Sequence, residues 1–303
     1  MLKGTPADIR SYRWGVFLVL AAGTCWSLIG LGIRHIESAT VWQILLYRSL
    51  ALTPVLFIVI TQRSSGRPFQ SIRTTGVAGV IGGGALVVAF AGGIYAIQMT
   101  SVAAAMFMFA SAPFMTAVLG IAVLGESVRK ETWICMGVAA IGVTIMVASG
   151  LALGHWAGIS AALASAFGFS VFTISLRWKK TEDMMPAVFL AGVFTIVTTS
   201  IICTTTGLSI VLSVNDTVIC LGLGVFQVGA GLVLYTLGSR LVPAGELALL
   251  SMSEVVLGPF WVWLFLSETV SLSILVGGGL LLGALAGNAI SGLRRKPPPV
   301  TLG

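Results

Sequence analysis

The sequence places an acidic side chain inside a long apolar segment, where ionised groups are uncommon. Glu254 lies near the middle of the segment 244–266, with Ser251 three residues before it on the same helical face. A carboxylate at that depth can bind a cationic or amine group of a solute, or carry a proton. The alternative is a structural glutamate that hydroxyl groups or a fixed arginine satisfy, and the sequence leaves both interpretations open.

Arg48 is the only basic side chain deep in a predicted helix, in the segment 40–61. A guanidinium can bind a substrate carboxylate through two parallel hydrogen bonds. Internal pairing, or extension of the side chain to the membrane interface, is the structural alternative. Glu126 and Glu268 occupy the ends of two predicted spans, where we expect a capping or structural role.

These residues lie on predicted membrane-spanning helices. Of the 303 residues, 57% are hydrophobic and only 9% are charged, and the mean hydropathy is +1.03. An ordinary soluble domain carries about 25% charged residues. At about 20 residues per span, the chain has room for about ten helices and for no separate soluble domain. The predicted spans cover residues 14–34, 40–61, 75–97, 101–124, 131–150, 156–177, 185–206, 216–238, 244–266 and 270–291.

The distribution of basic residues predicts how the chain is oriented. With the N-terminus in the cytoplasm, all 17 Lys and Arg residues except Arg34 and Arg48 fall on the cytoplasmic side, including Lys3, Lys180 and Arg294–Lys296. We therefore expect a multi-pass protein of the bacterial inner membrane with both termini in the cytoplasm. The net charge of +7 follows from this topology and does not indicate a nucleic-acid partner.

The sequence lacks the motifs of common enzyme classes. It contains no phosphate-binding G-x-x-x-x-G-K-[ST] loop, no H-E-x-x-H and no G-x-S-x-G. The four cysteines lie within or at the edge of apolar segments without metal-ligand spacing, and the two histidines lie near predicted helix ends. We predict no enzymatic activity, no metal site and no cofactor. An intramembrane enzyme that acts on lipid is one alternative.

The two halves of the sequence resemble each other. Gly125-Glu126 follows the fourth predicted span, and Ser267-Glu268 follows the ninth. Each half contains five spans, an odd number, so the halves must have opposite orientations. The sequence therefore predicts an all-α integral membrane fold of two inverted five-helix repeats, residues 1–150 and residues 151–303.

These features together resemble the drug/metabolite transporter superfamily, in particular its EamA-type members. The resemblance is carried by the ten spans, the paired glutamates, Trp26 within span one and the sequence Tyr95-Ala96-Ile97-Gln98 before span four. It implies a secondary transporter that exports a small metabolite, such as an amino acid, by alternating access. An uncoupled, channel-like facilitator is the alternative. Proton coupling and the choice between monomer and homodimer stay open.

The resemblance also implies where the substrate binds. The family's cavity lies between the halves near the midplane and is lined by spans one, three, four, six, eight and nine. Carried onto this chain, it implies a site of aromatic, amide, hydroxyl and carboxylate side chains. The residues are Trp26, Tyr95, Phe109, Phe169, Gln227, Tyr235, Ser251 and Glu254. Ordinary helix packing is the alternative for each aromatic residue.

Prolines and glycines give two further expectations. Pro113 of span four fits the family pattern, but Val255 stands at its counterpart in span nine and Pro259 follows one turn later. A kink displaced by a turn is therefore expected in span nine. In span ten, Gly279, Gly283 and Gly287 recur every four residues, as Gly79 and Gly83 do in span three. This spacing predicts close helix packing at Gly283.

Overall fold

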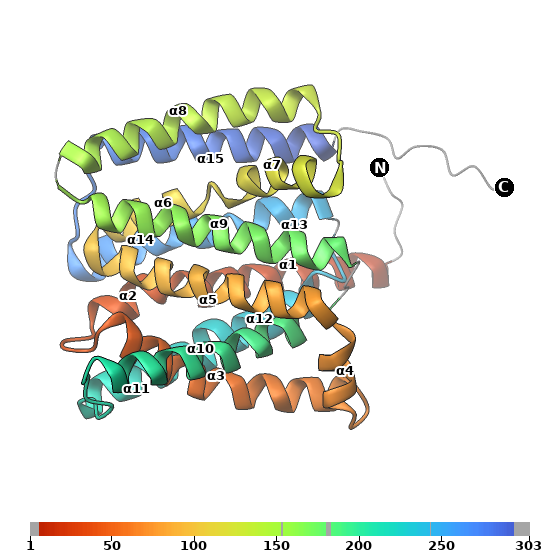
Figure 1. Cartoon of the computed structure of the whole chain (residues 1–303). Helices are drawn as coiled ribbons and strands as arrows, with labels where there is room; N and C mark the ends of the chain where they lie inside the picture. The colour runs from red at the N-terminus through yellow and green to blue at the C-terminus, as the bar shows by residue number, and fades with distance from the viewer. Residues whose placement is uncertain (1–5, 153, 180–182, 243, 294–303) are drawn as a thin grey trace.

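The computed structural model describes residues 6–152, 154–179, 183–242 and 244–293 (Figure 1). Ten helical stretches in these ranges are long and apolar enough to cross a membrane, which confirms the predicted number of spans. The observed spans cover Ser11–Arg34, Val41–Arg63, Gly76–Met99, Val102–Leu124, Lys130–Ala152, Trp156–Trp178, Met185–Thr205, Val214–Gly238, Leu249–Leu266 and Leu272–Ser291. Lys3, Lys180 and Arg294–Lys296, on which the orientation partly depends, lie outside the described residues.

Six spans are single helices and four are divided. The single helices are α3 (Val41–Arg63), α5 (Gly76–Met99), α8 (Lys130–Ala152), α9 (Trp156–Trp178), α10 (Met185–Thr205) and α15 (Leu272–Leu293). Span one consists of α1 (Pro6–Ser27) and α2 (Ile29–Arg34), and span four of α6 (Val102–Phe109) and α7 (Ala112–Leu124). Span eight consists of α11 (Val214–Gly222), the π-helix η1 (Leu223–Ala230) and α12 (Gly231–Gly238). Span nine consists of α13 (Ala244–Ser251) and α14 (Ser253–Leu266), and the short α4 (Pro68–Thr74) joins spans two and three.

Spans four and nine break at equivalent positions. α6 ends at Phe109 and α13 ends at Ser251, each the same number of residues before the glutamate that follows its span. Gly125 and Ser267, which end these spans, both adopt the left-handed backbone conformation, with φ of 66° and 54°. Figure 1 shows α6 and α7 running in the opposite direction to α13 and α14, as inverted halves require.

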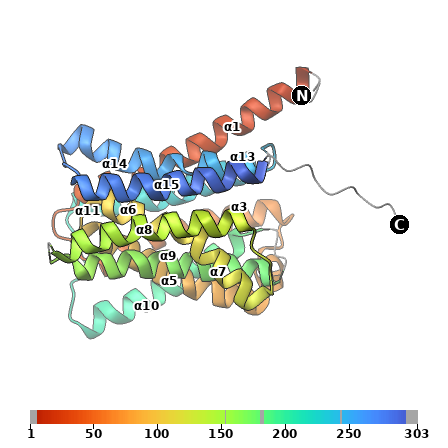
Figure 2. The same cartoon turned by 90° about the horizontal axis from the view of Figure 1, so that it is seen from above.

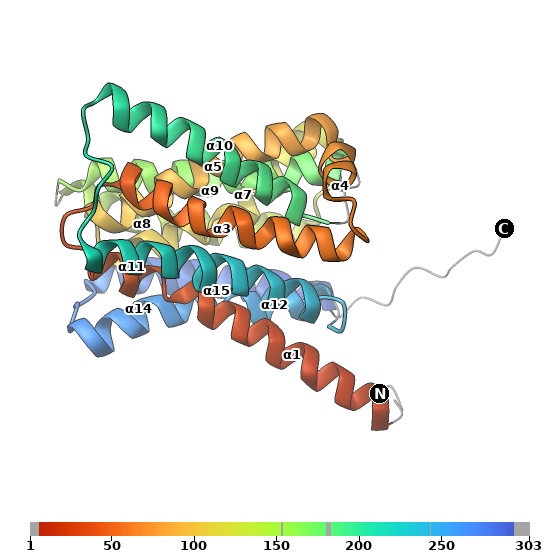
Figure 3. The ribbon, with the colours of Figure 1, turned by 90° about the horizontal axis from the view of Figure 1, so that it is seen from below.

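The packing between spans follows the same relation. α5 of span three lies against α9 of span six, and α1 of span one lies against α12 of span eight. Spans five and ten lie side by side as α8 and α15 (Figures 1 and 2), and spans two and seven as α3 and α10 (Figure 3). In the predicted repeat, spans one to five correspond in order to spans six to ten. Replacing each span by its counterpart turns each of these helix pairs into itself or into another of the pairs named here. The arrangement therefore supports an inverted repeat.

Ion pairs link the two halves at opposite ends of the bundle. Arg34 Nε, at the end of span one, lies 2.9 Å from Glu268 Oε2, after span nine. Arg177, near the end of span six, pairs with Glu126, after span four. Each pair joins one half to the other. Both glutamates therefore have the structural role that the sequence predicts.

The helix break in span nine precedes Pro259, at which the sequence predicts a displaced kink. The break lies at Met252, and Pro259 lies inside the continuous helix α14. The Met252 amide donates to the Leu249 carbonyl over 3.1 Å, an i to i+3 bond that tightens the end of α13. The break in span nine therefore has the same register as the break in span four without a proline there, and a bend at Pro259 stays a prediction.

The glycines of spans three and ten differ in their packing. A Cβ added to Gly83 would lie 3.2 Å from the backbone of α10, so this glycine marks a close helix contact as predicted. A Cβ at Gly283 would have no atom of the described residues within 4 Å, so the prediction for Gly283 is wrong. α15 turns another face toward α8, where a Cβ on Gly277 would lie 2.6 Å from the Gly142 carbonyl oxygen.

Candidate functional site

The break in span nine positions Glu254. This residue lies in the first turn of α14, directly after the break at Met252, and its side chain is half-buried. Span one approaches closely here, since a Cβ added to Gly23 would lie 3.6 Å from the Glu254 amide nitrogen. The first turn of a helix has free N–H groups that attract negative charge. The break therefore gives a carboxylate a favourable place at mid-depth.

Tyr235 of α12 lies beside the acidic residue. The Tyr235 side chain lies near Ser251 and within electrostatic range of Glu254. The Ser251 hydroxyl donates to the Leu247 carbonyl over 2.8 Å, which fixes it at the last turn of α13. A phenol, a hydroxyl and a carboxylate therefore meet where spans eight and nine face each other.

Trp26 extends this group to span one. Its ring centroid lies 5.2 Å from that of Tyr235, with the two planes tilted by 42°. The Gln227 side-chain amide donates to the Trp26 carbonyl over 3.3 Å. A Cβ on Gly231 would lie 2.6 Å from Trp26 Cδ1, so only glycine fits beside the indole. We refer below to the central cluster, which comprises Trp26, Gln227, Tyr235, Ser251 and Glu254.

The other three predicted residues pack on spans three, four and six. Phe109 and Phe169 form an edge-to-face pair with ring centroids 5.5 Å apart, and Phe169 also contacts Phe172 at 5.8 Å. Tyr95 is half-buried and packs against the larger apolar core. These contacts are those of ordinary aromatic packing, the alternative that the sequence left open. A substrate-binding role for these three residues stays a prediction.

The π-helix η1 carries Gln227 into the central cluster. π-Helical turns are rare and often occur at functional sites, because they widen the helix and redirect its side chains. Sequence reasoning missed this element. Its signal is the glycine content of span eight, where Gly224, Gly229 and Gly231 let neighbouring helices approach.

Several polar atoms near the middle of the bundle are buried without a hydrogen-bond partner in the described part of the chain. They are Arg48 Nε, Thr53 Oγ1, Gln227 Oε1 and Ser253 Oγ. An unpaired polar atom is costly in an apolar interior, so such atoms favour the entry of water or of a polar solute. Gln227 belongs to the central cluster, and Ser253 directly precedes Glu254. Sequence reasoning missed Ser253.

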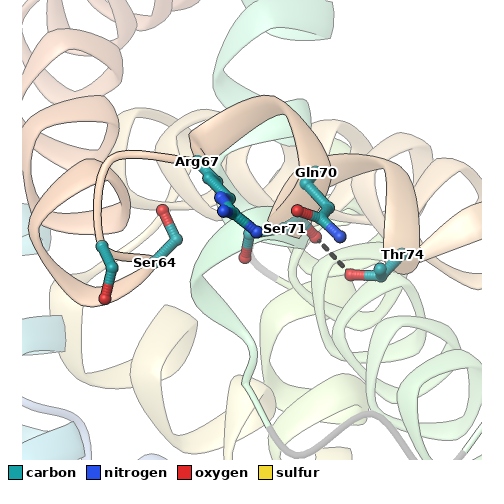
Figure 4. Close-up of a pocket in the computed structure, with 6 residues that line it drawn as sticks. Ser64, Arg67, Gln70, Ser71 and Thr74 are labelled. Carbon is teal, nitrogen blue, oxygen red and sulfur yellow. Dashed lines mark hydrogen bonds between the residues drawn. The ribbon is translucent and has the colours of Figure 1, made fainter.

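Two open depressions at the ends of the bundle contain none of the eight predicted substrate-binding residues. The first lies where α3 meets α4 and is lined by Ser64, Ser65, Arg67, Gln70, Ser71 and Thr74 (Figure 4). In it, the Thr74 hydroxyl donates to the Ser71 carbonyl over 2.7 Å. The second surrounds the Arg34–Glu268 ion pair. Neither depression is at the depth of the central cluster.

Comparison with known proteins agrees with a membrane-spanning transporter fold. Residues 13–148, which contain spans one to five, match the EamA-like transporter family. The first half of the chain is therefore similar to this family. The resemblance to EamA-type members of the drug/metabolite transporter superfamily is thereby confirmed.

Two individual proteins extend this comparison. A relative from Vibrio cholerae serotype O1, named only as an uncharacterized transporter, is 27% identical over 200 residues. That match covers 63% of this chain and 62% of the relative's length. A protein of known crystal structure is 17% identical, with a TM-score of 0.67, over 92% of this chain and 99% of that one. At this identity the second comparison establishes a shared fold only.

Proposed function

We propose that this protein is a secondary transporter of the EamA-like family that exports a small amphipathic metabolite, such as an amino acid, by alternating access. The observation that carries the proposal is the central cluster. Its indole, phenol, amide, hydroxyl and carboxylate converge from spans one, eight and nine. Polar side chains at mid-depth are costly unless they serve function or structure. Aromatic faces and hydrogen-bonding groups suit a solute with both apolar and polar parts.

In the proposed cycle, the two five-helix halves move relative to each other. The Arg34–Glu268 ion pair joins them at one end of the bundle, and the Arg177–Glu126 pair joins them at the other. Rocking of the halves about a midplane site opens one end while the other stays closed. In the proposed cycle, each ion pair breaks when its own end opens. Glu254 binds the amine of the solute or carries a proton.

The proposed location is the bacterial inner membrane, with both termini in the cytoplasm. The bias of Lys and Arg toward one side supports this orientation. A reporter fused to the C-terminus should then read as cytoplasmic, and a reporter in the 207–213 loop as periplasmic. The opposite pair of signals would invert the proposed topology and the direction of transport with it.

A flux experiment tests the proposal. The purified full-length protein is reconstituted into liposomes and screened against pooled labelled metabolites, with and without a pH gradient. We expect saturable uptake of at least one amphipathic solute, and counterflow when unlabelled solute is loaded inside. Non-saturating flux without counterflow would instead indicate a channel-like facilitator. Flux no greater than that of protein-free liposomes, with chemical change of the lipid, would indicate an intramembrane enzyme.

A further inference from the structure

Arg48 is a fully enclosed cation in the middle of α3. Its side chain is only 2% exposed and is among the largest buried side chains of the protein. The guanidinium carbon lies 4.5 Å from the centre of the Phe90 ring on α5. η1 packs against the same turn of α3, since a Cβ on Gly224 would lie 3.1 Å from the Arg48 carbonyl carbon. The side chain therefore does not extend to the membrane interface.

This cation has no anionic partner in the described ranges. The ion pairs found there are Arg34–Glu268, Arg63–Asp183 and Arg177–Glu126. The Nε of Arg48 is buried without a hydrogen-bond acceptor among the described residues. The Phe90 ring stabilises the positive charge through a cation–π contact. Because a ring face supplies no carboxylate oxygen, it leaves the Nε donor of Arg48 unused.

Asp216, on α11 of the neighbouring span, is already committed to other donors. Its carboxylate accepts hydrogen bonds from the backbone amides of Glu37, Ser38 and Ala39, over 3.0 to 3.2 Å. It also accepts from the Ser38 hydroxyl. These bonds hold the loop between spans one and two against α11. The Asp216 carboxylate therefore bonds to that loop and does not pair with Arg48.

We propose that Arg48 binds the carboxylate of the transported solute. An arginine presents paired N–H donors in a planar fork that matches a carboxylate, and it is the usual residue at such sites. η1 lies against the backbone of Arg48 through Gly224, and its Gln227 belongs to the central cluster. The inference thus rests on the proposed transport function and narrows its substrate class to carboxylate-bearing solutes.

A stability measurement distinguishes an Arg48 that binds solute from an Arg48 that is purely structural. A buried charge without a partner destabilises the fold, and an apolar side chain of similar length relieves that cost. If Arg48 binds a solute anion, Arg48→Met should therefore melt at or above the temperature of the wild-type protein. If Arg48 is structural, Arg48→Met should melt at a lower temperature or fail to fold. Either of those results would overturn the proposal.

Ligand binding is tested with matched acids and amides. The melting temperature of the purified full-length protein is measured with L-phenylalanine against L-phenylalaninamide, and with 3-phenylpropionate against 3-phenylpropanamide. We expect each acid to raise the wild-type Tm more than its amide does. The difference should vanish in Arg48→Met and persist in part in Arg48→Lys, which keeps the charge without the fork.

Three results would contradict the carboxylate site. They are an equal effect of acids and amides on the wild-type protein, an undiminished difference in Arg48→Met, and full reproduction of the acid effect by sodium chloride. Failure of the site and failure of the transport proposal are distinguishable. Saturable transport restricted to solutes without a carboxylate would reject the site alone. Acid-specific stabilisation by Arg48 without flux into liposomes would reject the transport function alone.

Discussion

Spans four and nine break at equivalent backbone positions, but the side chains next to the two breaks differ. Both break in the same register, and both end in a left-handed residue followed by a glutamate. The first turn after the break carries buried Ala112 in span four and half-buried Glu254 at the equivalent place in span nine. The two halves therefore share the backbone geometry of the break, while the acidic group of the central cluster is present in one half only.

The two ion pairs that join the halves also differ from each other in their surroundings. The Arg34 and Glu268 side chains are 27% and 21% exposed, and Glu268 Oε1 also accepts from the Val102 amide at the start of α6 over 2.8 Å. The Arg177 and Glu126 side chains are 47% and 37% exposed. The Arg34–Glu268 pair therefore has an additional hydrogen bond and is less exposed to solvent than the Arg177–Glu126 pair. We therefore expect the two ion pairs to contribute unequally to the free energy of unfolding.

Replacement of Glu254 should have the largest effect on transport. Glu254→Gln keeps the shape and hydrogen-bonding capacity of the side chain but removes its charge. We expect a folded protein whose transport rate falls by about tenfold or more, because loss of one transition-state contact of 1.4 kcal/mol already gives that factor. The pH dependence of transport should flatten. The measurement is the initial rate of uptake into liposomes, using the solute found by the screen.

Two control variants sharpen this comparison. Ala112→Ser adds a small polar group at the matching position of span four and should leave most of the transport rate intact. Val256→Ala changes a side chain of α14 that is 53% exposed on the outer surface. If Glu254→Gln folds and transports at the wild-type rate with the same pH dependence, span nine has no special role.

The ion pairs should differ in stability by a measurable amount. Glu268→Gln leaves Arg34 without its charged acceptor and weakens the bond from the Val102 amide. We expect a loss of about 1–3 kcal/mol, typical of a hydrogen bond to a charged group. Glu126→Gln, in a more exposed pair, should cost about 0–1 kcal/mol. Thermal unfolding in detergent compares the two, and an equal shift in Tm would remove the distinction between the ends of the bundle.

The left-handed residues that end spans four and nine should show the smallest effects, with opposite signs. Ser267 has a φ of 54°, which costs a residue with a Cβ about 1 kcal/mol, so Ser267→Gly should raise the Tm slightly. Gly125 meets the same need without strain, and Gly125→Ala should lower the Tm by a similar amount. Shifts of the same sign would mean that the two ends are not conformationally equivalent.

Hydropathy was sufficient to predict the ten spans, because each apolar run is long enough to cross the bilayer and is bounded by polar residues. The break at Met252 was not predictable from Pro259, since a proline can remain inside a helix when neighbouring contacts hold the backbone. The packing error at Gly283 has a related cause. A four-residue glycine spacing marks a smooth face, but only the neighbouring helix decides which face is covered, and α8 contacts Gly277 instead.

The candidate site was predictable in part. Glu254, Ser251 and Trp26 could be identified because polar or indole groups in the middle of apolar spans are conspicuous. Contacts between spans depend on helix rotation, which the sequence does not specify. For that reason the stacking of Trp26 on Tyr235 and the placement of Arg48 over Phe90 appear only in the structure.

Water access to the central cluster tests the transport account most directly, and it requires no knowledge of the substrate. Ser251→Cys is introduced into a variant whose native cysteines are replaced by serine or alanine. The replaced residues are Cys25, Cys135, Cys203 and Cys220. A membrane-impermeant thiol reagent is then applied to right-side-out and to inside-out vesicles. Val262→Cys, at a position that is 1% exposed in the same helix bundle, is the control.

Alternating access predicts that Ser251→Cys reacts from both sides of the membrane, because each half-cycle opens the central cluster to one compartment. The Val262→Cys control should stay unlabelled in both vesicle types. Labelling of Ser251→Cys from neither side, or from one side only, would contradict a transport pathway through the break in span nine.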